Sequence, residues 1–119
     1  AHGDPMDAFD FLTLAIRNYH DSGSFSLILG PLTILAALLD RLGYHEPAAT
    51  ISHFADRPFP RTGYPEITTT IHHLRAVLGD QAYESFARVG ASMTNGAMAA
   101  YALEQIDRAR ADRERATVN

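Results

Sequence analysis

Apolar residues recur every three or four positions along most of this chain, which is the spacing of one face of an α-helix. In the first segment, Asp4 can cap free amides, Pro5 suits the first helical position, and Gly23 ends the helix. Phe9 and Leu12 begin its apolar stripe. No stretch alternates between apolar and polar residues as a half-buried strand would. The pattern therefore predicts an all-α fold.

The second predicted helix, Phe25 to Leu42, is apolar on nearly every side. A helix of this kind belongs in the middle of a packed array. It is not a membrane span, because Gly30-Pro31 interrupts a run already shorter than the ~20 apolar residues that a bilayer needs. Because Pro31 lacks an amide hydrogen, we expect a kink or a late helix start there.

Four further helices are predicted after the second, which gives an antiparallel array of about six. We expect the third helix to begin at Pro47 and the fourth to run from Glu66 to Leu78. Asp80 should cap the fifth helix and Thr94 the sixth, whose charged C-terminal end should fray. Residues 1–119 then form a single helical domain. It divides into helices within 4–55, a Pro-rich linker over 56–65 and C-terminal helices within 66–112.

The composition excludes several classes of enzyme. The net charge of −4, with 46% hydrophobic and 20% charged residues, is ordinary for a soluble domain and disfavours a general nucleic-acid coat. The chain has neither Cys nor Lys, which excludes disulfides, thiolate zinc sites, Schiff-base chemistry and a Walker A lysine. The lack of Cys mildly favours a reducing compartment, and we expect a cytoplasmic protein. The opening Ala1-His2-Gly3, in place of a methionine, indicates an excised fragment with residues left from cloning.

Two alanine-containing segments are in register at about 34 residues, the period of tetratricopeptide (TPR) arrays, since Ala15 and Ala49 correspond. Three stretches carry a more specific likeness: AIRNYHDSG (15–23), LAALLDRLGYHEPAATI (35–51) and LRAVLGDQAYESFARVGASMTNGAMAAYALEQI (74–106). Together they resemble the end of the helical repeat region in large actinobacterial signalling regulators of the STAND ATPase class. The likeness extends from Asp4 to about Arg110.

This resemblance implies a TPR-like fold and a regulatory role. In such proteins a P-loop NTPase module precedes the repeats, a LuxR-type helix-turn-helix often follows them, and some carry a nucleotide cyclase. The ATP-binding and catalytic residues belong to those other modules, so the resemblance assigns no catalytic, cofactor-binding or metal residue to this chain. It implies a non-enzymatic interaction or regulatory module that contacts a protein partner, an inducer or other domains of a parent chain. DNA would be bound only through domains outside this sequence.

Two other classes of function have weaker signals. Tyr19-His20-Asp21-Ser22 contains the residue types of a hydrolase triad, but neighbouring residues diverge, and a helix C-terminus explains them better. His72 and His73 point about 100° apart on a helix, so they cannot chelate a metal jointly. A stand-alone metal protein or enzyme would combine one of them with a distant histidine: His20, His45 or His53.

The third class is direct DNA binding by the last two helices, whose connection through Thr94 resembles a helix-turn-helix. The net charge argues against it. Acidic residues interleave with the basic residues near the C-terminus, and Glu104 is placed to pair with Arg108 one turn later, so a solvated helix is the preferred interpretation. The basic residues are Arg108, Arg110, Arg113 and Arg115.

Seven aromatic side chains are expected in the core, because they fall on the apolar faces of predicted helices: Phe9, Phe11, Tyr19, Phe54, Tyr83, Phe86 and Tyr101. The second helix has more apolar surface than its two sequence neighbours can cover. We expect either that the later helices fold back over it or, by slight preference, that two copies cover it as a homodimer. The predicted interaction surface is Leu27, Leu29, Leu32, Leu35 and Leu39.

Overall fold

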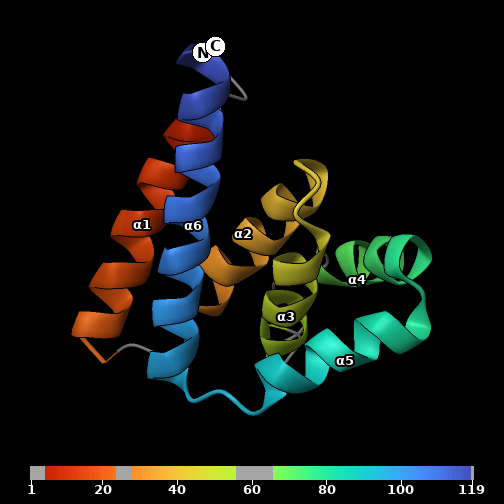
Figure 1. Cartoon of the computed structure of the whole chain (residues 1–119). Helices are drawn as coiled ribbons and strands as arrows, with labels where there is room; N and C mark the ends of the chain where they lie inside the picture. The colour runs from red at the N-terminus through yellow and green to blue at the C-terminus, as the bar shows by residue number, and fades with distance from the viewer. Residues whose placement is uncertain (1–4, 24–27, 56–65, 119) are drawn as a thin grey trace.

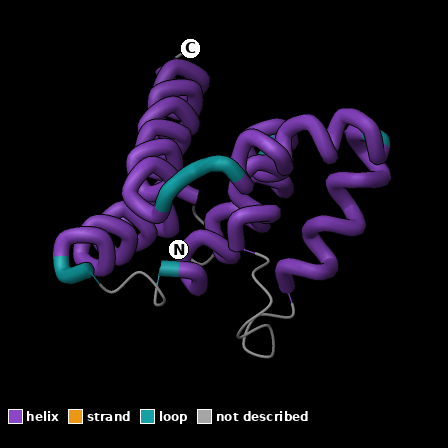
Figure 2. Tube along the Cα trace, turned by 90° about the horizontal axis from the view of Figure 1, so that it is seen from below, coloured by secondary structure: helices purple, strands orange, loops and turns teal. Residues whose placement is uncertain are grey.

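The computed structural model describes residues 5–23, 28–55 and 66–118, and every regular element in these ranges is an α-helix (Figures 1 and 2). The all-α prediction is therefore confirmed for the described residues. None of these helices combines the length and apolar content required to cross a bilayer. The helices are α1 (Pro5–Asp21), α2 (Leu29–Arg41), α3 (His45–Ala55), α4 (Glu66–Leu78), α5 (Asp80–Ala91) and α6 (Asn95–Val118).

Helix starts follow local chemistry, with one correction, at the cap of α5. The late start at Pro31 is confirmed, since α2 begins at Leu29 and proline lies in the first turn, where no amide partner is needed. Thr94 caps α6 as predicted, because its Oγ1 accepts from the amide of Ala97 at 3.1 Å. Asp80 is the first helical residue of α5 and not its cap, which is Gly79 with a positive φ of 89° that glycine adopts without strain.

Two other helix ends differ from the sequence prediction. α3 begins at His45, two residues before Pro47, which therefore lies in its first turn. α6 remains helical through Val118, where we expected fraying of the charged end. The Pro-rich segment 56–65 and the start of the second predicted helix at Phe25 lie outside the described residues.

Helix α3 is the centre of the packing. It contacts α2, α4, α5 and α6, while α1 packs against α2 and α6 (Figure 1). α1 descends and α6 ascends in this view, so the first and last helices lie side by side and antiparallel. Arg110 of α6 joins them by an ion pair with Asp10 and a hydrogen bond of 3.3 Å to the Thr13 hydroxyl. The array therefore closes on itself between its first and last helices.

Three of the five residues of the predicted interaction surface lie inside this single chain. Leu32 and Leu35 are fully buried and Leu39 is 1% exposed, so these three side chains offer no surface to a partner in this fold. For these three residues the structure shows the alternative that we ranked below the homodimer, in which other helices of the same chain cover α2. Leu27 and the side chain of Leu29 lie outside the described residues. A homodimer through this face stays a prediction without structural support.

One aromatic expectation is wrong. Phe11 is 62% exposed, because it lies to one side of the buried Phe9, Leu12 and Ile16 stripe on α1. Phe9 and Tyr83 are buried as expected, while Tyr19, Phe86 and Tyr101 are partly buried against the core and the Phe54 side chain lies outside the described residues.

The backbones of α5 and α3 approach each other closely at a glycine. The buried stripe of α5 consists of Tyr83, Ala87 and Gly90 at successive helical turns. A Cβ atom added to Gly90 would lie only 2.1 Å from the carbonyl oxygen of Thr50. Gly90 therefore sets the distance between the two helices, because no other residue lacks this atom.

Candidate functional site

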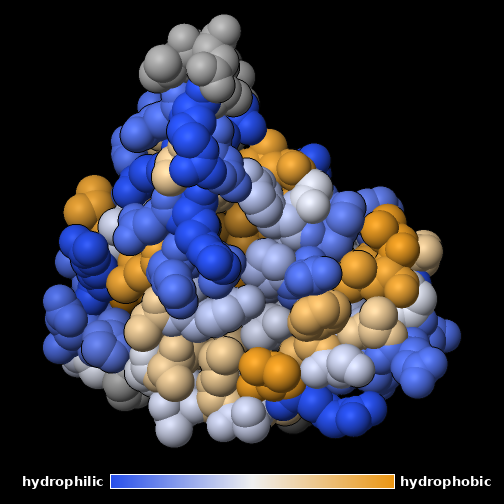
Figure 3. All heavy atoms as spheres, viewed as in Figure 1, coloured by the Kyte–Doolittle hydropathy of each residue, from blue (hydrophilic) through white to orange (hydrophobic). Residues whose placement is uncertain are grey.

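A groove of about 460 Å³ lies between the α2–α3 turn and the upper half of α6, and we call it the α6 groove. Figure 3 shows hydrophilic side chains covering the exposed side of the upper part of α6. The groove itself combines apolar and polar walls, as ligand pockets of this size do. Its apolar residues are Leu39, Pro47 and Ala111, and its polar residues are Tyr44, Gln105, Arg108, Asp112 and Arg115.

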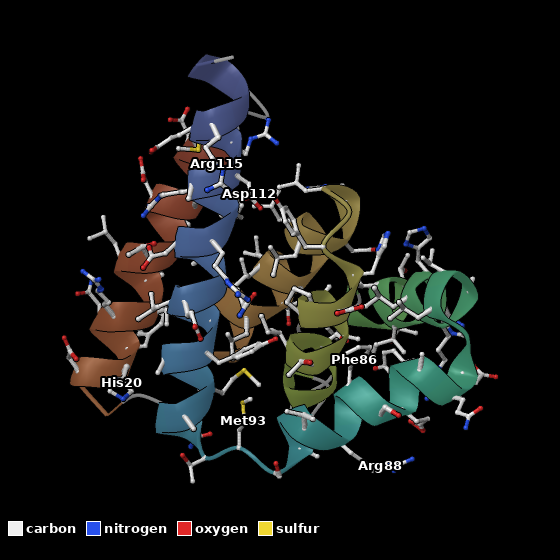
Figure 4. All side chains as sticks on the ribbon, viewed as in Figure 1. His20, Phe86, Arg88, Met93, Asp112 and Arg115 are labelled. Carbon is white, nitrogen blue, oxygen red and sulfur yellow. The ribbon has the colours of Figure 1, made fainter. Side chains whose placement is uncertain are left out.

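Three of the polar side chains form a connected network. The Tyr44 hydroxyl donates to Asp112 Oδ2 at 3.0 Å, and Arg115 pairs with Asp112 one turn along α6. Figure 4 shows Asp112 and Arg115 close together on the upper part of α6, on the side toward the α2–α3 turn. Burial raises the pKa of Tyr44, and the hydrogen bond to the Asp112 carboxylate raises it further. Asp112 is therefore an already engaged acceptor.

Gln105 lies deeper in the same groove and has no such partner. Its residue is only 8% exposed, and no hydrogen bond reaches its side chain from the described part of the chain. Gln105 lies within the buried stripe of α6, between Ala102 and Ala109, where an apolar side chain would pack with no loss of stability. A buried carboxamide left unpaired costs on the order of 1–3 kcal/mol. Such a group in a folded protein calls for an explanation.

Arg108 supplies the free positive charge of the groove. The expected pair with Glu104 does not form, and within the described ranges Arg108 makes no ion pair. By contrast, Arg110 is engaged with Asp10, and Arg115 with Asp112. Sequence reasoning treated these arginines as one solvated face, and the structure separates them into paired and unpaired groups.

Two tyrosines, one beside α6 and one on it, make the stability of the fold fall at alkaline pH. Burial is the main cause that raises the pKa of Tyr44 and of Tyr101 above the ordinary value of 10.0. Because the folded chain then holds these protons more tightly than the unfolded chain, their contribution is complete below pH 10 and is lost as pH rises through the raised values. Urea midpoints of the native chain should therefore fall above pH 10, and the double variant Tyr44→Phe/Tyr101→Phe should show a shallower slope. An unchanged slope would contradict this assignment.

A second cluster of functional residue types lies where α2, α3 and α4 meet. Asp40 is buried, and its carboxylate oxygens accept from His45 Nδ1 at 3.0 Å and from His73 Nδ1 at 2.7 Å. The sequence placed His45 and His73 among possible site histidines, and the structure brings these two together through an aspartate that the sequence analysis did not single out. A neutral ring that donates from Nδ1 keeps its lone pair on Nε2.

An open hollow of about 500 Å³ adjoins His73 and contains the buried hydroxyl of Thr70. Thr70 has no hydrogen-bond partner among the described residues. A helical threonine can satisfy its hydroxyl on the carbonyl one turn earlier by a change of χ1, whereas the Gln105 carboxamide must take its partner from what enters the groove, whether water or a ligand. The α6 groove is therefore the stronger candidate site.

We expect the Asp40 cluster to be structural. Asp40→Asn keeps the shape but leaves one histidine donor facing an amide N–H group, which should cost about 1–3 kcal/mol in the free energy of unfolding measured with urea. The matched control is Asp107→Asn, because Asp107 is 71% exposed and lies 3.7 Å from Arg110. Its effect should stay within about 0.5 kcal/mol. Equal losses from both variants would show that the two histidine contacts contribute nothing.

The remaining sequence candidates do not converge. His20 and Asp21 lie at the exposed C-terminal end of α1, where Figure 4 shows His20, and Ser22 bonds back to the Tyr19 carbonyl oxygen at 3.3 Å. His72 is exposed, and the His53 side chain lies outside the described residues. No three His, Asp or Glu side chains in the described ranges are arranged to hold a metal ion. These residues form no triad.

Comparison of the chain with known protein families, with curated protein sequences and with solved structures finds no match. The site is therefore defined by its own geometry. Its distinguishing features are a buried, unpartnered carboxamide, one unpaired guanidinium and an engaged carboxylate in a single groove.

Proposed function

We propose that this chain is a non-enzymatic interaction and regulatory module that receives a ligand or partner in the α6 groove. The observation that carries this proposal is Gln105, which lines the groove while buried and without a partner. Binding groups are often retained at some cost in stability because they recognise something outside the protein. The Tyr44 hydroxyl donates to Asp112, but the pKa of Tyr44 is raised by burial and by that carboxylate, which disfavours its use as an activated nucleophile.

The wider context of the proposal comes from the sequence. The resemblance to the TPR-like region of STAND-class regulators, and the recurrence near 34 residues, support a sensing role within a multidomain ATP-dependent transcriptional regulator of the LuxR type. In that setting the partners would be other domains of the parent chain, or a protein or inducer in the cytoplasm. Reading the coding sequence upstream of Asp4 tests this context: a P-loop supports it, and a start codon at Met6 counts against it.

The groove itself is tested by mapping binding without assuming a ligand. We suggest screening a small-molecule fragment library by amide NMR on the uniformly labelled chain. The expected result is a set of hits whose shift changes cluster at Tyr44, Gln105, Arg108 and Asp112. Hits confined to the hollow beside His73, or the absence of hits at the groove, would contradict the proposal.

A second candidate function rests on the Asp40 cluster. Orientation of a histidine by a buried carboxylate is a feature of general bases, and His73 is 54% exposed at the edge of a hollow. Of the alternative that the sequence left open, a stand-alone metal-binding protein or an enzyme that uses histidine, this geometry favours the histidine-based hydrolase. Protein purified without a His tag should be assayed for stoichiometric zinc or iron and for ester hydrolysis. Either result, abolished by Asp40→Asn, would favour the alternative over the interaction module.

A further inference from the structure

We infer that the α6 groove recognises a small organic monoanion with an apolar portion, of the carboxylate class, through Arg108 and Gln105. This inference rests on the proposed function and specifies the ligand class of the same groove. Three properties of the lining carry it: the charge balance, the unsatisfied carboxamide and the apolar wall.

The charge balance selects a single negative charge. Four of the lining side chains are neutral or mutually satisfied: Gln105 is uncharged, and Tyr44 and Arg115 both engage the Asp112 carboxylate. Arg108 remains as one uncompensated cation. A guanidinium binds a carboxylate through two parallel N–H donors. A dianionic phosphate would meet the negative charge of Asp112 with only one free cation to balance it, so a monoanion fits better.

The carboxamide of Gln105 supplies directional recognition. It offers two donors and one acceptor, and it lies on α6 one turn before Arg108. A ligand carboxylate that accepts from Arg108 can also accept from the Gln105 amide N–H. This contact removes the cost that Gln105 imposes on the free protein, so the residue makes opposite contributions to stability and to binding.

The apolar part of the ligand has a defined place. Leu39, Pro47 and Ala111 line the same groove and present only hydrocarbon. An alkyl or aryl group beside the carboxylate would therefore lose water-exposed area against these residues. Affinity should increase with the length of that group, at about fourfold for each buried methylene.

The test uses the full chain and three probes: hexanoate, octanoate and octylammonium. Calorimetry should show octanoate binding on the order of tenfold more tightly than hexanoate, with no binding of octylammonium, because the amine is repelled by Arg108. Arg108→Gln should weaken octanoate binding at least tenfold. Arg88→Gln is the matched control, because Arg88 is exposed on α5 and lies far from the groove (Figure 4). Equal weakening by both variants would overturn the inference.

Gln105→Met provides a readout that a structural role would not produce. Removing the unsatisfied carboxamide should raise the thermal midpoint by about 3–8 °C while weakening octanoate binding about tenfold. A lower midpoint with unchanged binding would overturn the role of Gln105. If carboxylates fail to bind but other fragments shift the groove resonances, this inference fails and the proposed function stands. If nothing perturbs the groove, both fail.

Discussion

Gly90→Ala should destabilise the fold by about 3 kcal/mol, which is a large share of the total stability of a domain of this size. The added Cβ would meet the Thr50 carbonyl oxygen at 2.1 Å, and that atom belongs to the backbone of the central helix α3. Neither helix can yield without moving the neighbours that pack on α3. Urea unfolding followed by circular dichroism at 222 nm would measure the loss.

The matched control for this variant is Gly96→Ala in α6. A Cβ atom there would meet only the His20 side chain, at an ordinary contact distance of 3.4 Å. Because alanine is the better helix former, the change should be neutral or stabilising by up to about 1 kcal/mol. If the two alanine variants unfold at the same urea concentration, the close approach of α5 to α3 is not a packing constraint.

Leu35→Glu should prevent folding of the isolated chain. Leu35 is fully buried in the middle of α2, and a glutamate there would lose its hydration without gaining a partner. A dimer interface would respond differently, because the variant would dissociate into folded monomers. Circular dichroism together with sedimentation equilibrium separates the two outcomes. A folded, monomeric variant would contradict the burial of Leu35 within one chain and restore the interface interpretation.

Ile34→Glu is the control, since it is the adjacent position on the same helix but 51% exposed. It should change the free energy of unfolding by less than about 1 kcal/mol. The comparison isolates burial from helix propensity, because both variants introduce glutamate at adjacent positions of α2.

The sequence predicted the helices well because their signals are local. Apolar spacing, Pro31 in a first turn and Thr94 as a cap each depend on a few neighbouring residues. Which neighbour covers α2 depends on contacts distant in sequence. Periodicity cannot distinguish a fold-back from a dimer, since both bury Leu35.

The candidate site was predicted less well for the same reason. Tyr44 and Asp112 are 68 positions apart, and His73 and Asp40 are 33 apart, so no motif connects them. Gln105 did have a local signal, as a polar residue within the apolar stripe of α6. Reading that stripe position by position would have identified it as an exception that needed a reason.

The pairing of the first and last helices has a consequence for how the chain is made. Asp10 and Arg110 are separated by 100 positions, so their contact forms only after α6 has left the ribosome. Until then the side of α1 that α6 covers faces solvent, and a nascent chain stalled before α6 carries that apolar surface unprotected. Closure of such a long loop also slows folding relative to a helical stack built from neighbours alone. A chain truncated within α6 should therefore aggregate during synthesis even though its earlier helices still form.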